Sequence, residues 1–238
     1  KLYLNDGIYL PKSEYTRAKI NSDMLKKLLL KGTFELSYAD FNENERFIIL
    51  VLLGFGGLAE LNVFQNCVIY IHNQLFGGNL WTPIVINNLI QGLIAKNIFE
   101  SIGEINQKIS FSHDKIFFGM QMLYEDDINR PLISHYFYDF LVDNNYSQIQ
   151  DADYLKIQHA FIAQTSSWRE ENYQYGYQKY LQKKFFDAVP IFKRILKANM
   201  PLTVEKIIVL GETFYETGDY FNAKSLLKNN AINSEDDF

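Results

Sequence analysis

The stretch LGETFYETGDYFNAKSLL, residues 210–227, repeats a pattern already present in YGYQKYLQKKFFDAVPIF, residues 175–192. Superposing the two stretches aligns two glycines and two alanines at one offset of 35 residues: Gly176 with Gly211, and Ala188 with Ala223. A fixed period of this length is typical of repeat proteins, in which each unit buries its apolar face against its neighbours. We therefore predict an array of stacked helices over residues 152–238.

The spacing of the later stretch resembles the tetratricopeptide repeat, a pair of helices in which small residues mark the close approaches. The matching positions are Leu210, Gly211, Phe214, Gly218, Tyr220, Ala223 and Leu227. The earlier stretch departs from the pattern at Lys183, which stands where the turn glycine falls. About three units are usually needed for a stable array. We therefore expect a helix over residues 154–165 to serve as half a unit, and the array to be incomplete.

Aromatic side chains are frequent in the repeats, and we interpret most of them as core and stacking surface. The functional alternative is a concave face that binds a protein or a peptide. The candidate partner-binding residues on such a face are Tyr173, Tyr177, Tyr180, Phe214 and Tyr215.

The region before the repeats, residues 45–146, is predicted to contain three helices and then a β-hairpin. Helices are expected at 45–53, 61–76 and 83–96, and strands at 98–102 and 108–112, with caps at Asn42 or Asn44, Gly77 and Thr82-Pro83. This order is typical of a winged-helix domain. Two further helices follow, at 114–124 and 127–143, and a polar stretch at 144–151 indicates the domain boundary. The fold class is therefore mainly α: a winged-helix domain with a small β-hairpin, then tetratricopeptide-like repeats.

The remaining N-terminal residues, 1–44, are expected to be an irregular lead-in with one helix over residues 22–31. The chain starts with Lys rather than Met, which favours a piece of a longer polypeptide. The longest apolar run, residues 47–59, is shorter than the roughly 20 residues that a membrane span needs, and glycines interrupt it. It is interpreted as a buried helix that ends in glycines.

Charge and cysteine content exclude some functional classes. A formal charge of −5 and an isoelectric point near 5.4 argue against a surface that binds nucleic acid. The third predicted helix carries only one base, Lys96, so DNA contact is not expected there. The single cysteine, Cys67, lies in an apolar context and cannot form an intrachain disulfide. A buried thiol in a reducing, cytoplasmic compartment is therefore expected.

The stretch ISFSHDKIFFG, residues 109–119, predicts a short strand that brings His113 and Asp114 to the first turn of a helix. An imidazole in that position can donate a hydrogen bond to an anion, and the backbone N–H groups of the helix start add to the same field. Asp114 is expected to cap its own helix. The alternative is a histidine that ties the hairpin to the helix without any ligand.

These features together resemble the middle of a STAND-type signalling NTPase, a family that includes NOD-like receptors, plant resistance proteins and bacterial regulators. Bacterial members often read F-x-H-D, and a histidine opens the next helix about twenty residues later. The matching positions here are Phe111, His113, Asp114 and His135. Plant and animal members have Met-His-Asp at this point, whereas this chain has Ser112 in place of the Met.

The resemblance implies a nucleotide-binding domain before the winged helix, with ADP or ATP as the cofactor of the longer protein and none in this chain. It implies that His113 contacts the β-phosphate of ADP and holds the closed state. The chain would then be a non-catalytic regulatory segment that couples nucleotide state to recognition of a partner protein by the repeats. The alternative function is a free-standing tetratricopeptide-like scaffold or peptide-binding protein.

The sequence indicates no catalytic or metal site. The run Gly54-Phe55-Gly56-Gly57 is not followed by Lys-Ser or Lys-Thr, which a phosphate loop needs. His72, His135 and His159 lack metal-ligand spacing, and we expect structural roles for them.

Overall fold

The computed structural model describes residues 2–5, 8–11, 38, 40–77, 81–104, 107–143, 149, 151–198 and 200–234. It divides into two compact units, Lys1–Ile133 (unit 1) and Ser134–Phe238 (unit 2). The predicted boundary lay at 144–151, whereas this division falls inside helix α6, Arg130–Asp143. The reason is packing: the later half of α6 belongs to unit 2, where Phe137 stacks on His159 with ring centroids 4.1 Å apart.

The centre of unit 1 is α2, Glu43–Gly54, which is buried along almost its whole length. Its start is fixed by a capping box. The Asn42 side chain accepts a hydrogen bond from the Glu45 N–H at 2.9 Å, and the Glu45 carboxylate accepts one from the Asn42 N–H at 3.2 Å. The same carboxylate pairs with Lys96 at 2.7 Å, so the buried charge is compensated. The prediction of a buried helix here is confirmed.

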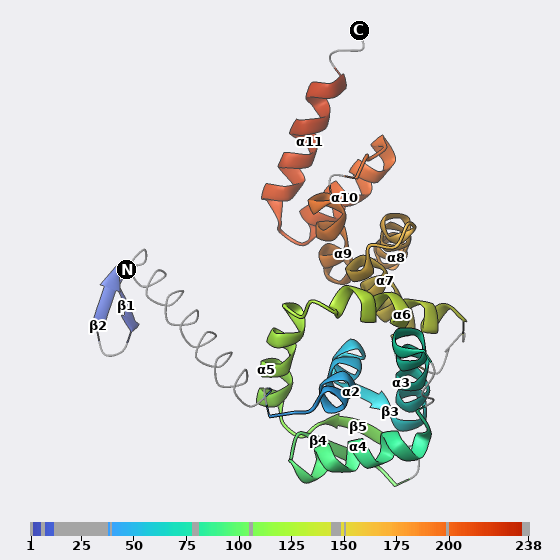
Figure 1. Ribbon diagram of the computed structural model, residues 1–238. Helices are drawn as coiled ribbons and strands as arrows, with labels where there is room; N and C mark the ends of the chain where they lie inside the picture. The colour runs from blue at the N-terminus through green and yellow to red at the C-terminus, as the bar shows by residue number, and fades with distance from the viewer. Residues whose placement is uncertain are drawn as a thin grey trace. The chain divides into compact units, whose positions relative to one another are not determined.

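Two more helices of unit 1, α3 (Leu61–Phe76) and α4 (Pro83–Ala95), follow α2 along the chain (Figure 1). The backbone of Gly77 at the end of α3 has a positive φ of 40°, which glycine adopts without a steric penalty. The Thr82 hydroxyl accepts a hydrogen bond from the Val85 N–H at 3.4 Å, and Pro83 occupies the first helical position. These ends agree with the sequence prediction.

Three strands of unit 1 form an antiparallel sheet in the order β3-β5-β4. Their bounds are Leu58–Glu60 for β3, Phe99–Ile102 for β4 and Lys108–Phe111 for β5. The hairpin β4–β5 was predicted, but β3 was not, because residues 47–59 were interpreted as one helix. The chain leaves α2 and turns through Gly56 and Gly57, whose φ angles are +77° and +90°, into β3. Glycine adopts such angles readily, and here the two glycines form the turn that leads from α2 directly into β3.

The N-terminal segment contains an antiparallel pair, β1 (Leu2–Asn5) with β2 (Ile8–Pro11). The lead-in over residues 1–44 was predicted to be irregular, so this hairpin is a correction for its first residues. The helix predicted over residues 22–31 lies outside the described residues.

The remaining helices follow one another along the chain. They are α5 (Asp114–Glu125), α6, α7 (Ala152–Ala163), α8 (Trp168–Leu181), α9 (Phe185–Lys197), α10 (Val204–Glu216) and α11 (Tyr220–Ser234). In unit 2, α8 and α9 form one helical hairpin, and α10 and α11 form another (Figure 1). We call them the first hairpin and the second hairpin.

The turns of the two hairpins have the same backbone geometry. Lys183 has a φ of +58°, and Gly218, 35 residues later, has a φ of +76°. The N–H of Lys183 donates to the Tyr180 carbonyl at 2.8 Å, and the N–H of Gly218 donates to the Tyr215 carbonyl at 3.0 Å. The period seen in the sequence is therefore a period of the structure, and Lys183 adopts the left-handed conformation that its glycine counterpart adopts.

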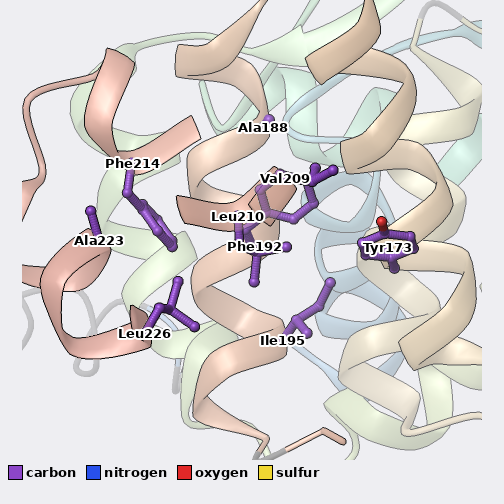
Figure 2. Packing of buried hydrophobic residues seen from close by; sticks show 9 residues of the cluster. All are labelled: Tyr173, Ala188, Phe192, Ile195, Val209, Leu210, Phe214, Ala223 and Leu226. Atoms are coloured by element: carbon purple, nitrogen blue, oxygen red, sulfur yellow. The ribbon is translucent and has the colours of Figure 1, made fainter. Parts of the chain in front are cut away.

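The core of the two hairpins is one continuous cluster (Figure 2). It consists of Tyr173, Ala188, Phe192, Ile195, Val209, Leu210, Phe214, Ala223 and Leu226. Gly176 lies against the ring of Phe192 so closely that a Cβ atom there would be 2.5 Å from Cε1. The expected close approach of the helices is thus present in the first hairpin. At Gly211, its counterpart, a Cβ atom would meet nothing within 4 Å, so the close approach expected there is absent.

Candidate functional site

The His113 imidazole lies on the surface of unit 1, between the end of β5 and the start of α5. Its backbone is extended, with φ −156° and ψ 138°, and its carbonyl accepts hydrogen bonds from the N–H groups of Ile116 and Phe117 at 2.9 and 3.1 Å. The side chain makes no capping hydrogen bond to the helix. The ring is therefore exposed beside the N-terminus of α5, as the sequence predicted.

His113 itself, and not Asp114, is the N-cap residue of α5. Asp114 is the first helical residue, so the expectation that it caps its own helix is wrong. The reason is that the extended backbone of the strand continues through His113, and helical dihedral angles begin one residue later. An acidic residue in this first turn still interacts favourably with the helix dipole.

Ser112 makes hydrogen bonds that connect the segment around His113 to the rest of unit 1. The Ser112 N–H donates to the Ile98 carbonyl at 3.0 Å, and its hydroxyl donates to the Asn97 carbonyl. Asn97 has a φ of +55°, a conformation that asparagine tolerates better than most residues. Ser112 therefore makes polar contacts with the turn between α4 and β4.

Aromatic side chains pack together next to the same segment. Phe111 contacts Phe99 edge-to-face with centroids 5.3 Å apart, and it also packs on Phe117 at 5.8 Å. A Cβ atom on Gly57 would be 2.6 Å from the Phe117 ring. The glycines after α2 thus provide a turn and a close approach for α5.

The five candidate partner-binding residues fall into two groups. Phe214 is fully buried and Tyr173 is 6% exposed, and both belong to the core of the hairpins. Neither can contact a partner without unfolding, so the prediction is corrected for these two. Tyr177 and Tyr180 are partly buried, whereas Tyr215 is 63% exposed. Only Tyr215 is freely available on the surface.

Three tyrosines of α8, Tyr173, Tyr177 and Tyr180, form a ladder of stacked rings. Centroids lie 5.9 Å apart from Tyr173 to Tyr177 and again from Tyr177 to Tyr180. Tyr180 donates its hydroxyl hydrogen to Glu212 of α10, and this bond raises the pKa of the phenol. The ladder is thus part of the contact between the two hairpins.

Lys206 of α10 joins the same contact. Its ammonium lies 4.3 Å from the centroid of the Tyr173 ring and 2.9 Å from the Glu170 carboxylate. The hydrogen bond from Lys206 lowers the pKa of Glu170. Charged residues on α8 and α10 therefore pair across the contact between the two hairpins.

The sequence prediction missed a set of exposed apolar residues on the second hairpin. Ile208 is 51% exposed and Leu227 is 61% exposed, although their counterparts one period earlier are core residues. The signal that could have found them is the period itself: a face that is covered in one repeat is uncovered in the next when no further helix packs on it.

The single cysteine and two of the three other histidines are buried, whereas His135 lies at the surface. Cys67 is fully buried, which raises the pKa of its thiol well above its ordinary value. His72 stacks on Trp81 with centroids 4.1 Å apart, and burial lowers the pKa of its imidazole. His159 stacks on Phe137, and His135 lies 3.6 Å from Asp139. Within the described part of the chain, no group of three potential metal ligands occurs.

Comparisons of the chain with protein-family models, with characterised proteins and with solved structures gave no match. The helices of the described segments include none that has both the length and the apolar character to cross a membrane.

Proposed function

We propose that this chain is a non-catalytic sensor and coupling segment of a larger STAND-type ATPase switch. Unit 1 is its winged-helix part and unit 2 its tetratricopeptide-like part. The observation that carries the proposal is the exposed imidazole of His113 at the N-terminus of α5, directly after the last strand of the sheet. The cytoplasm is the proposed location, because the single Cys67 cannot form an intrachain disulfide.

The topology of unit 1 supports the winged-helix part. The order α2-β3-α3-α4-β4-β5, with β3 pairing to β5, is the order of a winged helix that has its short first strand. Nucleic acid is not the proposed partner, because α4 contains no lysine or arginine and Lys96, just beyond its end, pairs with Glu45. A packing role against a neighbouring domain fits this charge pattern better.

The chemistry of His113 fits an anion supplied by that neighbouring domain. A helix N-terminus presents N–H groups and a partial positive charge, and an imidazole beside it adds a hydrogen-bond donor. A β-phosphate placed there would stabilise the closed state by its differential contact with His113. Release of that contact, when a partner engages the repeats, would shift the population to the open state.

The proposal is tested in the longer polypeptide that contains this chain together with a nucleotide-binding domain. His113→Ala should accelerate release of a fluorescent ADP analogue about 10- to 100-fold, because a hydrogen bond to a charged group contributes about 1.5–3 kcal/mol. Basal signalling should rise in parallel. His113→Gln, which keeps a hydrogen-bond donor, should release the ADP analogue more slowly than His113→Ala does.

The matched control is Glu125→Gln, an exposed substitution at the other end of α5. It should leave the ADP release rate unchanged. An ADP release rate that is the same in His113→Ala as in the unaltered protein would refute the role proposed for His113.

A second candidate function, a free-standing tetratricopeptide-like scaffold that binds a protein or peptide, is favoured by the exposed apolar residues of the second hairpin. The sequence encoded upstream of Lys1 distinguishes the switch from the scaffold. A glycine-rich loop with Lys-Ser or Lys-Thr encoded upstream of Lys1 favours the switch. A gene without such a loop favours the scaffold.

A further inference from the structure

We propose that an exposed face on the second hairpin binds an amphipathic helix of a partner protein. This open face consists of Glu205, Ile208 and Tyr215 on α10 together with Leu227 and Lys228 on α11. The proposal specifies the ligand chemistry of the repeats and rests on that half of the proposed function. It does not depend on the role of His113.

The first hairpin shows what such a face binds, because its equivalent face is already covered by a helix. The residues 35 positions earlier are Glu170, Tyr173, Tyr180, Phe192 and Lys193. Helix α10 packs on this face: its Leu210 and Phe214 lie in the same apolar cluster as Tyr173 and Phe192, and its Ile207 is also buried. The interface inside the chain is therefore a template for the open face.

Burial differs sharply between the two faces. Tyr173 is 6% exposed and its counterpart Ile208 is 51% exposed, while Phe192 is fully buried and its counterpart Leu227 is 61% exposed. Isolated apolar side chains on a surface are ordinary, but here they occupy the positions that a neighbouring helix covers one period earlier. The open face is therefore equivalent in position to a face that a helix covers in the first hairpin.

The template also predicts the charges of the occupant. Lys206 pairs with Glu170 at 2.9 Å, so a lysine of the occupant would pair with Glu205. Glu212 accepts the hydroxyl hydrogen of Tyr180, so a carboxylate of the occupant would accept that of Tyr215.

The same reasoning applies at the end of the face on α11. Asp219 pairs with Lys193 at 2.7 Å, and a further acid would therefore pair with Lys228. The occupant would be a helix that carries a lysine. Counted from that lysine, it would have aliphatic residues one and four positions later, an acidic residue six positions later and an aromatic residue eight positions later. That pattern is the one α10 carries from Lys206 to Phe214.

A second copy of this chain cannot supply its α10 as the occupant. The three apolar residues that would contact the open face, Ile207, Leu210 and Phe214, are buried within each copy's own hairpins. The occupant that we propose is a helix of another protein whose apolar face is uncovered.

The experiment uses the full chain and a labelled synthetic peptide with the sequence of residues 200–218. Because isolated helices of this length are marginal in water, a lactam bridge holds the peptide helical. The bridge joins positions 204 and 208, substituted as Val204→Glu and Ile208→Lys, which are exposed in α10 and would face away from the binding surface. Circular dichroism verifies the helix, and fluorescence anisotropy measures binding. We expect a dissociation constant of about micromolar order, typical of one helix in a groove.

Two variants of the chain form a matched pair. Leu227→Asp places a charge on the open face and should weaken peptide binding at least about 10-fold. Phe221→Asp is the control, because Phe221 is 82% exposed and its counterpart Phe186 is 78% exposed. That position is not covered in either hairpin, so the control should bind the peptide as the unaltered chain does.

Three results would overturn the proposal. One is failure of the helical peptide to bind the unaltered chain. Another is an equal loss of binding in both variants, which would indicate general hydrophobic adhesion. The third is a dimer in sedimentation that Leu227→Asp dissociates while the peptide fails to bind, which would make a second copy the occupant. None of these results bears on ADP release by His113 variants.

Discussion

The first and second hairpins share a sequence pattern, a turn geometry and a period, yet they differ in what covers them. In the first hairpin Phe192 is fully buried against Gly176 and the next helix, whereas Leu227 at the same place in the second hairpin is mostly exposed. The difference teaches that the environment of a repeat residue depends on its neighbour in the stack as much as on its own position. Equivalent substitutions in the two hairpins should therefore have unequal effects.

The largest effect is expected at the aromatic centre of the first hairpin. Phe192→Ala removes a fully buried ring and should lower the free energy of unfolding of unit 2 by about 3–5 kcal/mol. Leu227→Ala, the equivalent change at an exposed site, should alter it by less than about 0.5 kcal/mol.

Denaturation monitored by tryptophan fluorescence tests this pair. The chain has two tryptophans, Trp81 in unit 1 and Trp168 in unit 2, so Trp168 reports on unit 2 alone in a Trp81→Phe background. Similar losses for the two variants would show that Leu227 is covered in solution, and the contrast between the hairpins would then fail.

A smaller effect, of opposite sign in the two hairpins, is expected at the paired glycines. Gly176→Ala places a Cβ atom 2.5 Å from the Phe192 ring and should destabilise unit 2 by about 1–3 kcal/mol through overpacking. Gly211→Ala meets no atom within 4 Å and should stabilise it by about 0.5–1 kcal/mol, because alanine favours the helix. Urea midpoints of the two variants measure the signs, and stabilisation by both would mean that the Phe192 ring moves aside easily.

The smallest effect is expected at the turns. Lys183 adopts a positive φ that costs a side-chain-bearing residue about 1 kcal/mol, so Lys183→Gly should raise the thermal midpoint of unit 2 by a few degrees. Gly218→Ala should lower it by a similar amount, since the same strain is introduced there. A midpoint that falls in Lys183→Gly would indicate that the added backbone freedom of the unfolded state outweighs the strain.

Much of unit 1 could be predicted from local signals. The capping box at Asn42, the Thr82-Pro83 start and the Gly77 end each depend on residues within one helical turn, and the structure has them where the sequence indicated. Strand β3 was missed because its three residues continue the apolar run of α2, and the glycines between them were interpreted as the end of a helix. Its strand geometry depends on pairing with β5, a partner about 50 residues away in the sequence.

The candidate site was predicted unevenly for the same reason. The position of His113 after a strand and before a helix is local information, and it is confirmed. Whether Phe214 or Ile208 of α10 faces the core depends on the direction from which α8 and α9 pack, and the sequence period alone does not give that direction. Two core residues were therefore taken for surface, and the open face was overlooked.

The complete burial of Cys67 means that the native chain exposes no thiol to labelling reagents in its described part. Because it is the single cysteine of the sequence, a maleimide dye added to the native protein has no accessible target until one is engineered. A cysteine introduced at Lys228 would then carry the only label, next to the surface where a helix is proposed to dock. The rate at which the dye slowly modifies Cys67 itself would measure how often unit 1 unfolds locally around this residue.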